Sequence, residues 1–572
     1  MSASNKKKLR KEQKAAAMSE KQKREQQEAK KLKAYTLTFA IVMLLVVAIV
    51  VGVIVSPMID GLVIRGSQSV IIGDHKLSAA DLTFFYIDAI TEHQQTVYDQ
   101  YYSSFGNYWS IMLGFDSTQP LSEQKYDDEG KTWAEYFMET AVDTARNTYA
   151  LYDDAMAKGH KLTDDEQKDL DSYLDSMELY ATYYGYSSVK SYLRSNYGNG
   201  ATEKNYSEYY RVCSVASSYL SKYYDDLDYK LEDYRAYEKD KYDDYSTVSY
   251  VYYTMKYNSY LGEGTKSEDG KTTTWTDEEK EAARAAMKAD MEKILGSEIT
   301  SKLKFDEAIQ ALEVNKIDET DKNAKKPTTS EVKKAYFENI TLHAGALEWL
   351  KESGRTPNEI KAFEVYTYEQ KEGLPENHEH GDECGCSRTV DGYTIVLFTE
   401  RDDNETKMVN VRHILVKFTG GTKDSNGNTT YSDAEKAKAK EEAEKLLKQW
   451  QEGKANEDSF AELANKESDD QNGKVTNGGL YEDVYPGQMV ENFENWCFAE
   501  GRKAGDTGIV ETEYGYHVMY YSSTDEMSYR DLMIDYDMRS ENTEKWRDEL
   551  AEKISCTIVS LSKLDADYIL SK

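Results

Sequence analysis

The sequence predicts an α+β protein made of an N-terminal transmembrane helix, a mainly helical region and two α/β domains. Three observations favour this architecture. The 572 residues exceed what one hydrophobic core usually supports, so several domains are expected. Residues 34–55 form an uncharged apolar run. A strand–helix–strand pattern occurs twice after residue 245, and its copies end in the similar stretches DGYTIVLFTERD (391–402) and YGYHVMYYSSTD (514–525).

The N-terminus predicts a membrane anchor. Residues 34–56 are long enough to span the hydrocarbon core, which takes about 20 residues, and residues 1–33 hold twelve Lys or Arg against four Glu. A secretory signal peptide is the alternative. The basic region is long for a signal peptide, no A-x-A pattern follows the run, and no cysteine precedes Cys213 to carry a lipid. We therefore expect an uncleaved single-pass anchor in the cell membrane, with a basic cytoplasmic tail and the bulk of the chain extracytoplasmic.

Charge and cysteine usage exclude several classes of partner and scaffold. The net charge is −33 although the tail is basic, so the rest of the chain is strongly acidic. This balance argues against nucleic acid as a partner, against docking on an anionic lipid surface and against a basic pocket for a phosphorylated residue. The five cysteines form no regular framework, which argues against a disulfide-stapled scaffold.

Residues 57–245 are interpreted as a helical domain. Residues 70–89 predict a short strand, a Gly-Asp turn and a helix capped near Ser78, and the segments that follow carry apolar and aromatic residues at three- and four-residue spacing. The chain has 47 tyrosines, many of them in this region. Stripes of tyrosine suit either a helix–helix core whose edges are exposed to solvent or a surface that holds non-native chains. The final segment, 526–572, predicts a helix and a short strand that are too small to bury an apolar face alone, so we expect it to complete this domain.

The repeated pattern predicts two α/β domains, 246–402 and 408–523. STVSYVYYTMKY (246–257) parallels MVNVRHILVKF (408–418), and each is followed by a charged amphipathic helix. Both helices begin with a capping box, in which a Ser or Thr is followed three residues later by Glu. The boxes are Thr276 with Glu279, and Ser432 with Glu435.

The second copy places two histidines on inward strand faces. Strand alternation puts His413 on the face of Val411 and Leu415, and His517 on that of Met519 and Tyr521. Buried imidazoles need hydrogen-bond partners. Between the strands lie a polar loop with Asp470 and the stretch GQMVENF, in which Met489 and Phe493 stand four apart on an expected helix. These residue types fit a metal site, an acid–base site or a binding pocket with a polar centre.

An ordered series of motifs gives this copy a family resemblance. VRHILVK, the segment Phe460 to Asp470, GGL, GQMV with Phe493, GDTG and the closing T-x-Y-G-Y-H occur in that order. Residues 408–523 therefore resemble a parvulin-type (PpiC/rotamase) peptidyl-prolyl isomerase domain. The resemblance implies two groups of site residues. The catalytic group would be His413, Asp470, His517 and Thr512, and the substrate-binding group Leu480, Met489 and Phe493.

Prolyl isomerisation suits these residue types and requires no cofactor. The rotation barrier of a peptide bond is about 18–20 kcal/mol because resonance must be broken, and X-Pro bonds isomerise slowly enough to limit folding. A pocket that holds the proline ring and favours the twisted amide would be sufficient. The alternative is that His413 and His517 form a buried pair that serves only stability.

The first copy resembles a degenerate parvulin domain. Aligning VSYVYY with VRHILV puts Tyr250 opposite His413, and Thr394 falls opposite His517. No equivalent of GQMV-x-x-x-F occurs between Asn315 and Trp349. We expect the fold to persist without isomerase activity, with an unrelated α/β insert as the alternative.

An insertion at 374–390 in the first copy carries a candidate zinc site. Its potential ligands are His378, His380, Cys384 and Cys386. The H-x-H and C-x-C spacings are tighter than the two to four intervening residues of most structural zinc sites. An acidic solvent loop and a cysteine pair that oxidises outside the cell are the competing interpretations.

Taken together, the anchor, the helical region and the paired domains resemble the membrane-anchored PrsA/SurA-like extracytoplasmic foldases. The resemblance implies a prolyl isomerase and chaperone whose clients are unfolded or partly folded exported proteins with X-Pro bonds, and whose helical body cradles them. The chain departs from the lipid-attached members, because no cysteine follows its apolar run. The alternative is a non-catalytic holdase or scaffold that uses parvulin folds only for binding.

Overall fold

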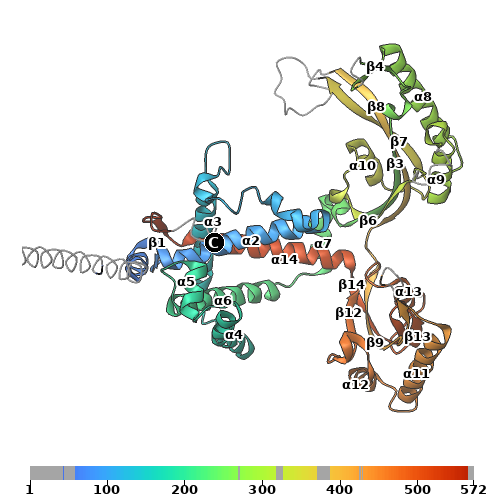
Figure 1. The fold of residues 1–572 in the computed structure, drawn as a ribbon. Coiled ribbons are helices and arrows are strands. Elements are labelled where there is room, and N and C mark those ends of the chain that lie inside the picture. Colours follow the sequence, from blue (N-terminus) through green and yellow to red (C-terminus); the bar gives the residue numbers. More distant parts are fainter. Residues whose placement is uncertain are drawn as a thin grey trace, which may run out of the picture. The chain divides into compact units, whose positions relative to one another are not determined.

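The computed structural model describes residues 43, 58–267, 271–316, 326–369, 387–423, 427 and 429–564 (Figure 1). Most of the predicted anchor and all four predicted zinc ligands (His378, His380, Cys384 and Cys386) lie outside these residues. Among the described residues, no helix combines the length and the apolar character needed to cross a membrane.

The chain divides into two compact units. Unit 1 ends at Asp228 and resumes at Arg539, and unit 2 comprises Tyr229–Met538. The sequence placed these boundaries near residues 245 and 526, so it assigned two segments to the wrong unit. The reason is that the segments pack on each other within unit 2: a buried cluster joins Tyr234 and Tyr245 to Ile534 and Met538.

After a helical segment at residues 58–66, unit 1 has a small antiparallel sheet. Strands β1 (Gln68–Ile72) and β2 (His75–Ser78) form a hairpin, and β15 (Cys556–Ile558) near the C-terminus pairs with β1. Val70 lies opposite Ile558 in this register. Among the described residues, the last strand therefore completes the sheet that the first strand begins.

Helices form the rest of unit 1, and their N-termini follow from the sequence. Ser78 caps α2 with a capping box to Asp81, and Thr132, Thr163 and Thr202 begin three further helices in the same way. The helices are α2 (Ala79–Phe105), α3 (Trp133–Ala157), α4 (Asp164–Tyr183), α5 (Val189–Tyr197), α6 (Glu203–Asp226) and the C-terminal part of α14 (Tyr529–Lys553).

The tyrosines of unit 1 divide between core and surface. Phe84 is fully buried, and its ring centroid lies 5.2 Å from that of Tyr197 and 5.4 Å from that of Tyr206. Such ring pairs stabilise a core by about 0.5–1.5 kcal/mol beyond area burial. Tyr183 and Tyr108, in contrast, are 80% and 73% exposed. The tyrosines of unit 1 thus include both core and surface residues, and a role of the exposed ones in holding non-native chains stays a prediction.

Unit 2 contains the same topology twice. The first repeat domain has the sheet order β6-β3-β8-β7, and the second has β12-β9-β14-β13, with all pairs antiparallel. The first sheet consists of β3 (Thr247–Lys256), β6 (Ser330–Tyr336), β7 (Ile360–Glu369) and β8 (Ser387–Asp402). The second consists of β9 (Lys407–Lys417), β12 (Leu480–Val484), β13 (Thr507–Glu511) and β14 (Gly515–Ser528).

Helices occupy equivalent places in the two repeat domains. Thr276 and Ser432 cap α8 and α11 with the predicted capping boxes. The helices are α8 (Asp277–Leu295), α9 (Lys302–Gln310) and α10 (Ala344–Lys351) in the first domain, and α11 (Asp433–Gln451), α12 (Glu457–Glu467) and α13 (Glu491–Cys497) in the second. In the second domain, α11 and α12 pack on one face of the sheet and α13 packs on the other (Figure 1).

The strand register corrects the alignment of the two copies. Thr394 lies opposite Thr254, and Val396 lies opposite Tyr252. In the second domain His517 lies opposite Leu415, and Met519 lies opposite His413. Tyr252, and not Tyr250, therefore occupies the position of His413. A shift of two residues preserves strand alternation, so the apolar pattern alone could not distinguish the two alignments.

Candidate functional site

Two histidines face each other on the central strands of the second repeat domain. His413 lies on β9 and His517 on the neighbouring β14, and their side chains are 1% and 6% exposed. Their Nδ1 atoms are 3.0 Å apart, which is hydrogen-bond distance. The pairing of alternate inward positions on adjacent strands brings the two imidazoles together as the sequence predicts.

Asp470 lies at the outer side of His413. It begins the 3-10 turn η8 (Asp470–Gly473), which follows α12. Its Oδ2 lies 3.2 Å from His413 Nε2, although the nitrogen makes no well-directed hydrogen bond in this arrangement. The Gln471 N–H donates to Asp470 Oδ1 over 2.9 Å. The contact with His413 and the hydrogen bond from the Gln471 N–H lower the pKa of Asp470 below its usual range, although partial burial acts to raise it.

Thr512 lies at the inner side of His517. Its Oγ1 is 2.9 Å from His517 Nε2, and it accepts a hydrogen bond from the Tyr514 N–H over 3.2 Å. Thr512 precedes the turn into β14 and is 5% exposed. Thr512, His517, His413 and Asp470 thus form a continuous row of polar groups through an otherwise apolar interior.

The surroundings of the row shift the pKa values of two of its members, His517 and Asp470. Burial, followed by repulsion from His413, lowers the pKa of His517 to about 3, against the opposing attraction of Asp470. At neutral pH His517 is therefore uncharged and Asp470 is ionised. A neutral imidazole carries one N–H, so His517 donates either to His413 or to Thr512 and accepts from the other.

An apolar shelf lies beside the histidines. Phe493 on α13 is 2% exposed, and its ring centroid lies 5.6 Å from that of His413 and 5.3 Å from that of His517. Met489 packs half-buried against the same cluster but precedes α13, so it does not share a helix with Phe493 as the spacing predicted. The buried members of the cluster are Val409, Val411, Val484, Phe493, Cys497, Val510, Met519 and Tyr521.

In the structure Tyr481, and not Leu480, lies at the site. Leu480 pairs with Arg412, which lies on the opposite face of β9 from His413, whereas Tyr481 pairs with Val411. The Tyr481 ring centroid is 4.7 Å from that of His413, and its hydroxyl donates to Asp470 Oδ2 over 2.9 Å. The assignment of Leu480 to the pocket was therefore wrong by one residue, which in a strand reverses the face. Strand alternation from Val411 would have indicated Tyr481.

The arrangement suits binding and electrostatic chemistry better than covalent chemistry. The thiol of Cys497 is buried in the shelf, and burial raises its pKa to about 12, so it is not a reactive thiolate at neutral pH. Among the described residues, no group of three His, Cys, Asp or Glu is placed to hold a metal ion. The apolar shelf with Phe493 and Met489 lies directly beside the polar row.

The first repeat domain has aromatic residues where the second has its polar row. Tyr252 and Thr394 occupy the histidine positions. The matching face is packed by Tyr250, Trp349 and Phe363. This domain therefore retains the topology but has neither imidazole.

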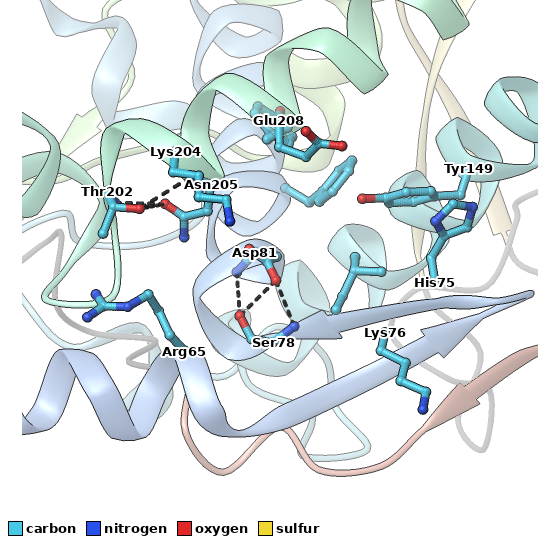
Figure 2. A pocket seen from close by; sticks show the side chains of 13 residues that line it. Arg65, His75, Lys76, Ser78, Asp81, Tyr149, Thr202, Lys204, Asn205 and Glu208 are labelled. Atoms are coloured by element: carbon cyan, nitrogen blue, oxygen red, sulfur yellow. Dashed lines mark hydrogen bonds between the residues drawn. The ribbon is translucent and has the colours of Figure 1, made fainter.

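Unit 1 has a separate hollow of about 420 Å³ where the N-termini of α2 and α6 approach each other (Figure 2). Two N–H groups at each of these N-termini are already bonded, because Ser78 with Asp81 and Thr202 with Asn205 form capping boxes. The charged groups that line it have both signs: Arg65, Lys76, Lys204, Asp81 and Glu208, with His75 beside them.

Comparison with known proteins agrees with the geometry of the second repeat domain. Residues 393–524 match the profile of the family described as the PPIC-type PPIASE domain. The foldase protein PrsA 1 of Listeria innocua is 42% identical over 64 residues, which cover 11% of this chain and 21% of the relative. The foldase protein PrsA of Exiguobacterium sibiricum is 30% identical over 117 residues, which cover 20% of this chain and 34% of the relative.

The chain thus spans about a fifth to a third of the length of these relatives. Among solved structures, PrsA from Bacillus subtilis aligns with 25% identity and a TM-score of 0.16, covering 26% of this chain and 48% of that one. The profile match begins in β8 and ends within β14, and it includes every residue of the polar row. Residues 393–524 therefore contain a PPIC-type, that is parvulin-type, peptidyl-prolyl isomerase domain.

Proposed function

We propose that the chain is a membrane-anchored, extracytoplasmic peptidyl-prolyl cis-trans isomerase and chaperone for exported proteins. The observation that carries the proposal is the His413–His517 pair, set between the Asp470 carboxylate and the apolar shelf in a domain that matches the isomerase family. The clients would be unfolded or partly folded proteins with X-Pro bonds.

The site would act by binding the twisted amide better than the planar one. The barrier to rotation is about 18–20 kcal/mol and arises from amide resonance. Burying the proline ring against Met489 and Phe493, at about 1.5–3 kcal/mol for each fully buried side chain of this size, would fix one side of the bond. The polar row then lies where the electron distribution of the amide changes during rotation. Interactions that strengthen only in the twisted state raise kcat.

The surface of unit 1 supports a chaperone role. Several large apolar side chains are exposed, including Ile111 at 76%, Leu179 at 71% and Tyr183 at 80%. Clusters of exposed apolar groups with polar rims mark interaction sites. We propose that they hold non-native segments. These side chains also favour the second candidate function, a non-catalytic holdase in which the parvulin folds serve only to bind clients.

The anchor and the zinc site remain predictions. The apolar run at 34–56 supports a single-pass membrane location with the N-terminus in the cytoplasm. The His₂Cys₂ set in the insertion at 374–390 supports zinc binding. Metal analysis of the purified chain beside a Cys384→Ser variant tests the second proposal, and protease accessibility of the tail in sealed membranes tests the first.

An isomerisation assay on a short X-Pro peptide separates the two candidate functions. We expect the full chain to accelerate cis-trans conversion and His413→Ala to lose most of that acceleration. A holdase would leave the peptide at its uncatalysed rate while still suppressing the aggregation of an unfolded client. Absence of acceleration by the intact chain would refute the catalytic proposal and leave the holdase.

A further inference from the structure

We propose that the first repeat domain positions the proline-binding loop of the second through Lys334, so that the site depends on the domain that lacks the histidine pair. The inference rests on the proposed isomerase function and adds a positioning residue to it. The proline-binding loop is defined as residues 485–489, which run from the end of β12 to Met489.

Lys334 reaches the loop directly. It lies on β6 of the first repeat domain, and its Nζ donates a hydrogen bond to the Pro486 carbonyl oxygen over 3.2 Å. The same Nζ lies 3.5 Å from Asp402 Oδ2, which belongs to the last strand of its own domain. The ammonium group thus joins a carboxylate of the first domain to a loop carbonyl of the second.

The backbone at Lys334 is held in an unusual conformation. Its φ is 46°, in the left-handed region that few residues with a side chain adopt. Its N–H donates to Ser249 Oγ on β3 over 3.0 Å. Conformations of this kind persist where the surroundings require them. At Lys334 these surroundings are the hydrogen bond from its N–H to β3 and the two contacts of its Nζ.

Gly487 allows the lysine stem to pack on the loop. Its φ is 95°, and a Cβ atom at this position would lie 3.0 Å from Lys334 Nζ and 3.3 Å from its Cδ. The Gly487 N–H donates to Glu494 Oε2 over 2.5 Å, and Glu494 follows Phe493 on α13. The lysine therefore contacts a loop segment that leads to Met489 on one side and is bonded to the helix of Phe493 on the other.

A second contact from the same strand supports the loop at its start. Tyr485 stacks on Tyr529 with ring centroids 3.6 Å apart and an interplanar angle of 7°. Tyr336, two residues after Lys334 on β6, donates its hydroxyl to Met533 Sδ over 3.0 Å and also contacts Tyr529. The first repeat domain thus reaches the loop both directly and through the first turns of α14.

These contacts predict an effect on substrate binding more than on the chemical step. The loop carries Met489, which forms part of the shelf for the proline ring, whereas the polar row lies on β9, β14 and η8. A less well-held loop binds the proline ring less tightly, both when the X-Pro amide is planar and when it is twisted. Such a loss raises KM and leaves kcat nearly unchanged.

The test compares Lys334→Met with Lys333→Met in the full chain. Methionine keeps the apolar stem and removes the ammonium, and Lys333 is an adjacent exposed lysine whose Nζ lies 3.9 Å from Glu331. For an X-Pro peptide we expect Lys334→Met to raise KM about three- to tenfold, the equivalent of one hydrogen bond, with kcat within about twofold. Lys333→Met should match the wild type, and Lys334→Arg should restore most of the affinity.

Equal KM values for the wild type and both methionine variants would overturn the positioning role while leaving the proposed isomerase function intact. An inactive wild type would instead overturn that function. If Lys334→Met does not fold, as judged by circular dichroism, Tyr336→Phe replaces it, because it removes only the hydroxyl contact with Met533 and Tyr529. We then expect a smaller rise in KM, and an unchanged KM would overturn the proposal.

Discussion

His413 and His517 share one hydrogen bond between like atoms, Nδ1 to Nδ1, at 3.0 Å. Such a bond requires a proton on one nitrogen and a lone pair on the other, so the two rings cannot both be doubly protonated without a clash of donors. Both rings are almost completely buried. If each ring carried a second proton, two positive charges would therefore lie side by side in an apolar interior. Protonation of these two histidines is therefore expected to lower the stability of the domain.

Acidification is expected to destabilise the second repeat domain through His517. Its pKa in the folded state is about 3, below the value of 6.5 for an unperturbed histidine. Between these values the unfolded chain binds more protons than the folded one, so stability falls as pH falls through this window. The slope reaches at most about 1.4 kcal/mol per pH unit. Urea unfolding of the wild type and of His517→Asn, repeated at several pH values between these two pKa values, measures this slope. The variant should show a shallower slope, and parallel curves would contradict the assignment.

Replacing Tyr481 by Phe should shift the pH profile of isomerisation. The hydroxyl of Tyr481 donates to Asp470, and this bond helps to lower the pKa of the carboxyl. Without it the pKa of Asp470 rises, so the acid limb of kcat/KM should move to higher pH, with a loss of about two- to tenfold at the plateau for one hydrogen bond. The measurement is the peptide assay across the acid range. Superimposable limbs would show that Tyr481 serves only packing.

Two apolar residues near the site should respond differently to truncation. Met489 belongs to the shelf beside Phe493, whereas Leu480 lies on the other face of the sheet with Arg412. Met489→Ala should therefore raise KM for an X-Pro peptide about tenfold, since truncating a bound apolar side chain removes roughly 1.5–3 kcal/mol at most. Leu480→Ala is the matched control and should leave KM unchanged. A larger effect at Leu480 would restore the assignment made from the sequence.

Local patterns in the sequence were sufficient for much of the fold and for the centre of the site. Capping boxes at Thr276 and Ser432 located two helix starts, and period-two alternation put His413 and His517 on one sheet face. These signals act over a few residues, where propensity and hydrogen bonding are set locally.

The misassigned features depend on register and on long-range packing. Leu480 and Tyr481 differ by one position after a loop in which Gly478 and Gly479 both have positive φ, and no apolar pattern fixes where the strand resumes. The alignment of Tyr250 with His413 failed because a two-residue shift keeps the alternation. The unit boundaries failed because the contacts that decide them, such as those of Arg530, join segments about 290 residues apart.

Arg530 provides the last prediction, which concerns stability. Its side chain is fully buried in unit 2 and pairs with Glu238, which is 5% exposed. It also donates to the carbonyl oxygens of Tyr242 and Asp403, so it joins the segments that enter and leave both repeat domains. Removing one partner of a buried pair leaves an uncompensated charge, which costs about 3–5 kcal/mol. Glu238→Gln should therefore lower the free energy of unfolding by about this amount, as measured by urea denaturation followed by circular dichroism. Glu442→Gln is the control, because Glu442 pairs with Lys445 on the exposed side of α11, where a pair contributes about 0–1 kcal/mol. Equal losses in the two variants would contradict the prediction and would mean that the remaining partners of Arg530, the carbonyl oxygens of Tyr242 and Asp403, suffice to stabilise its charge.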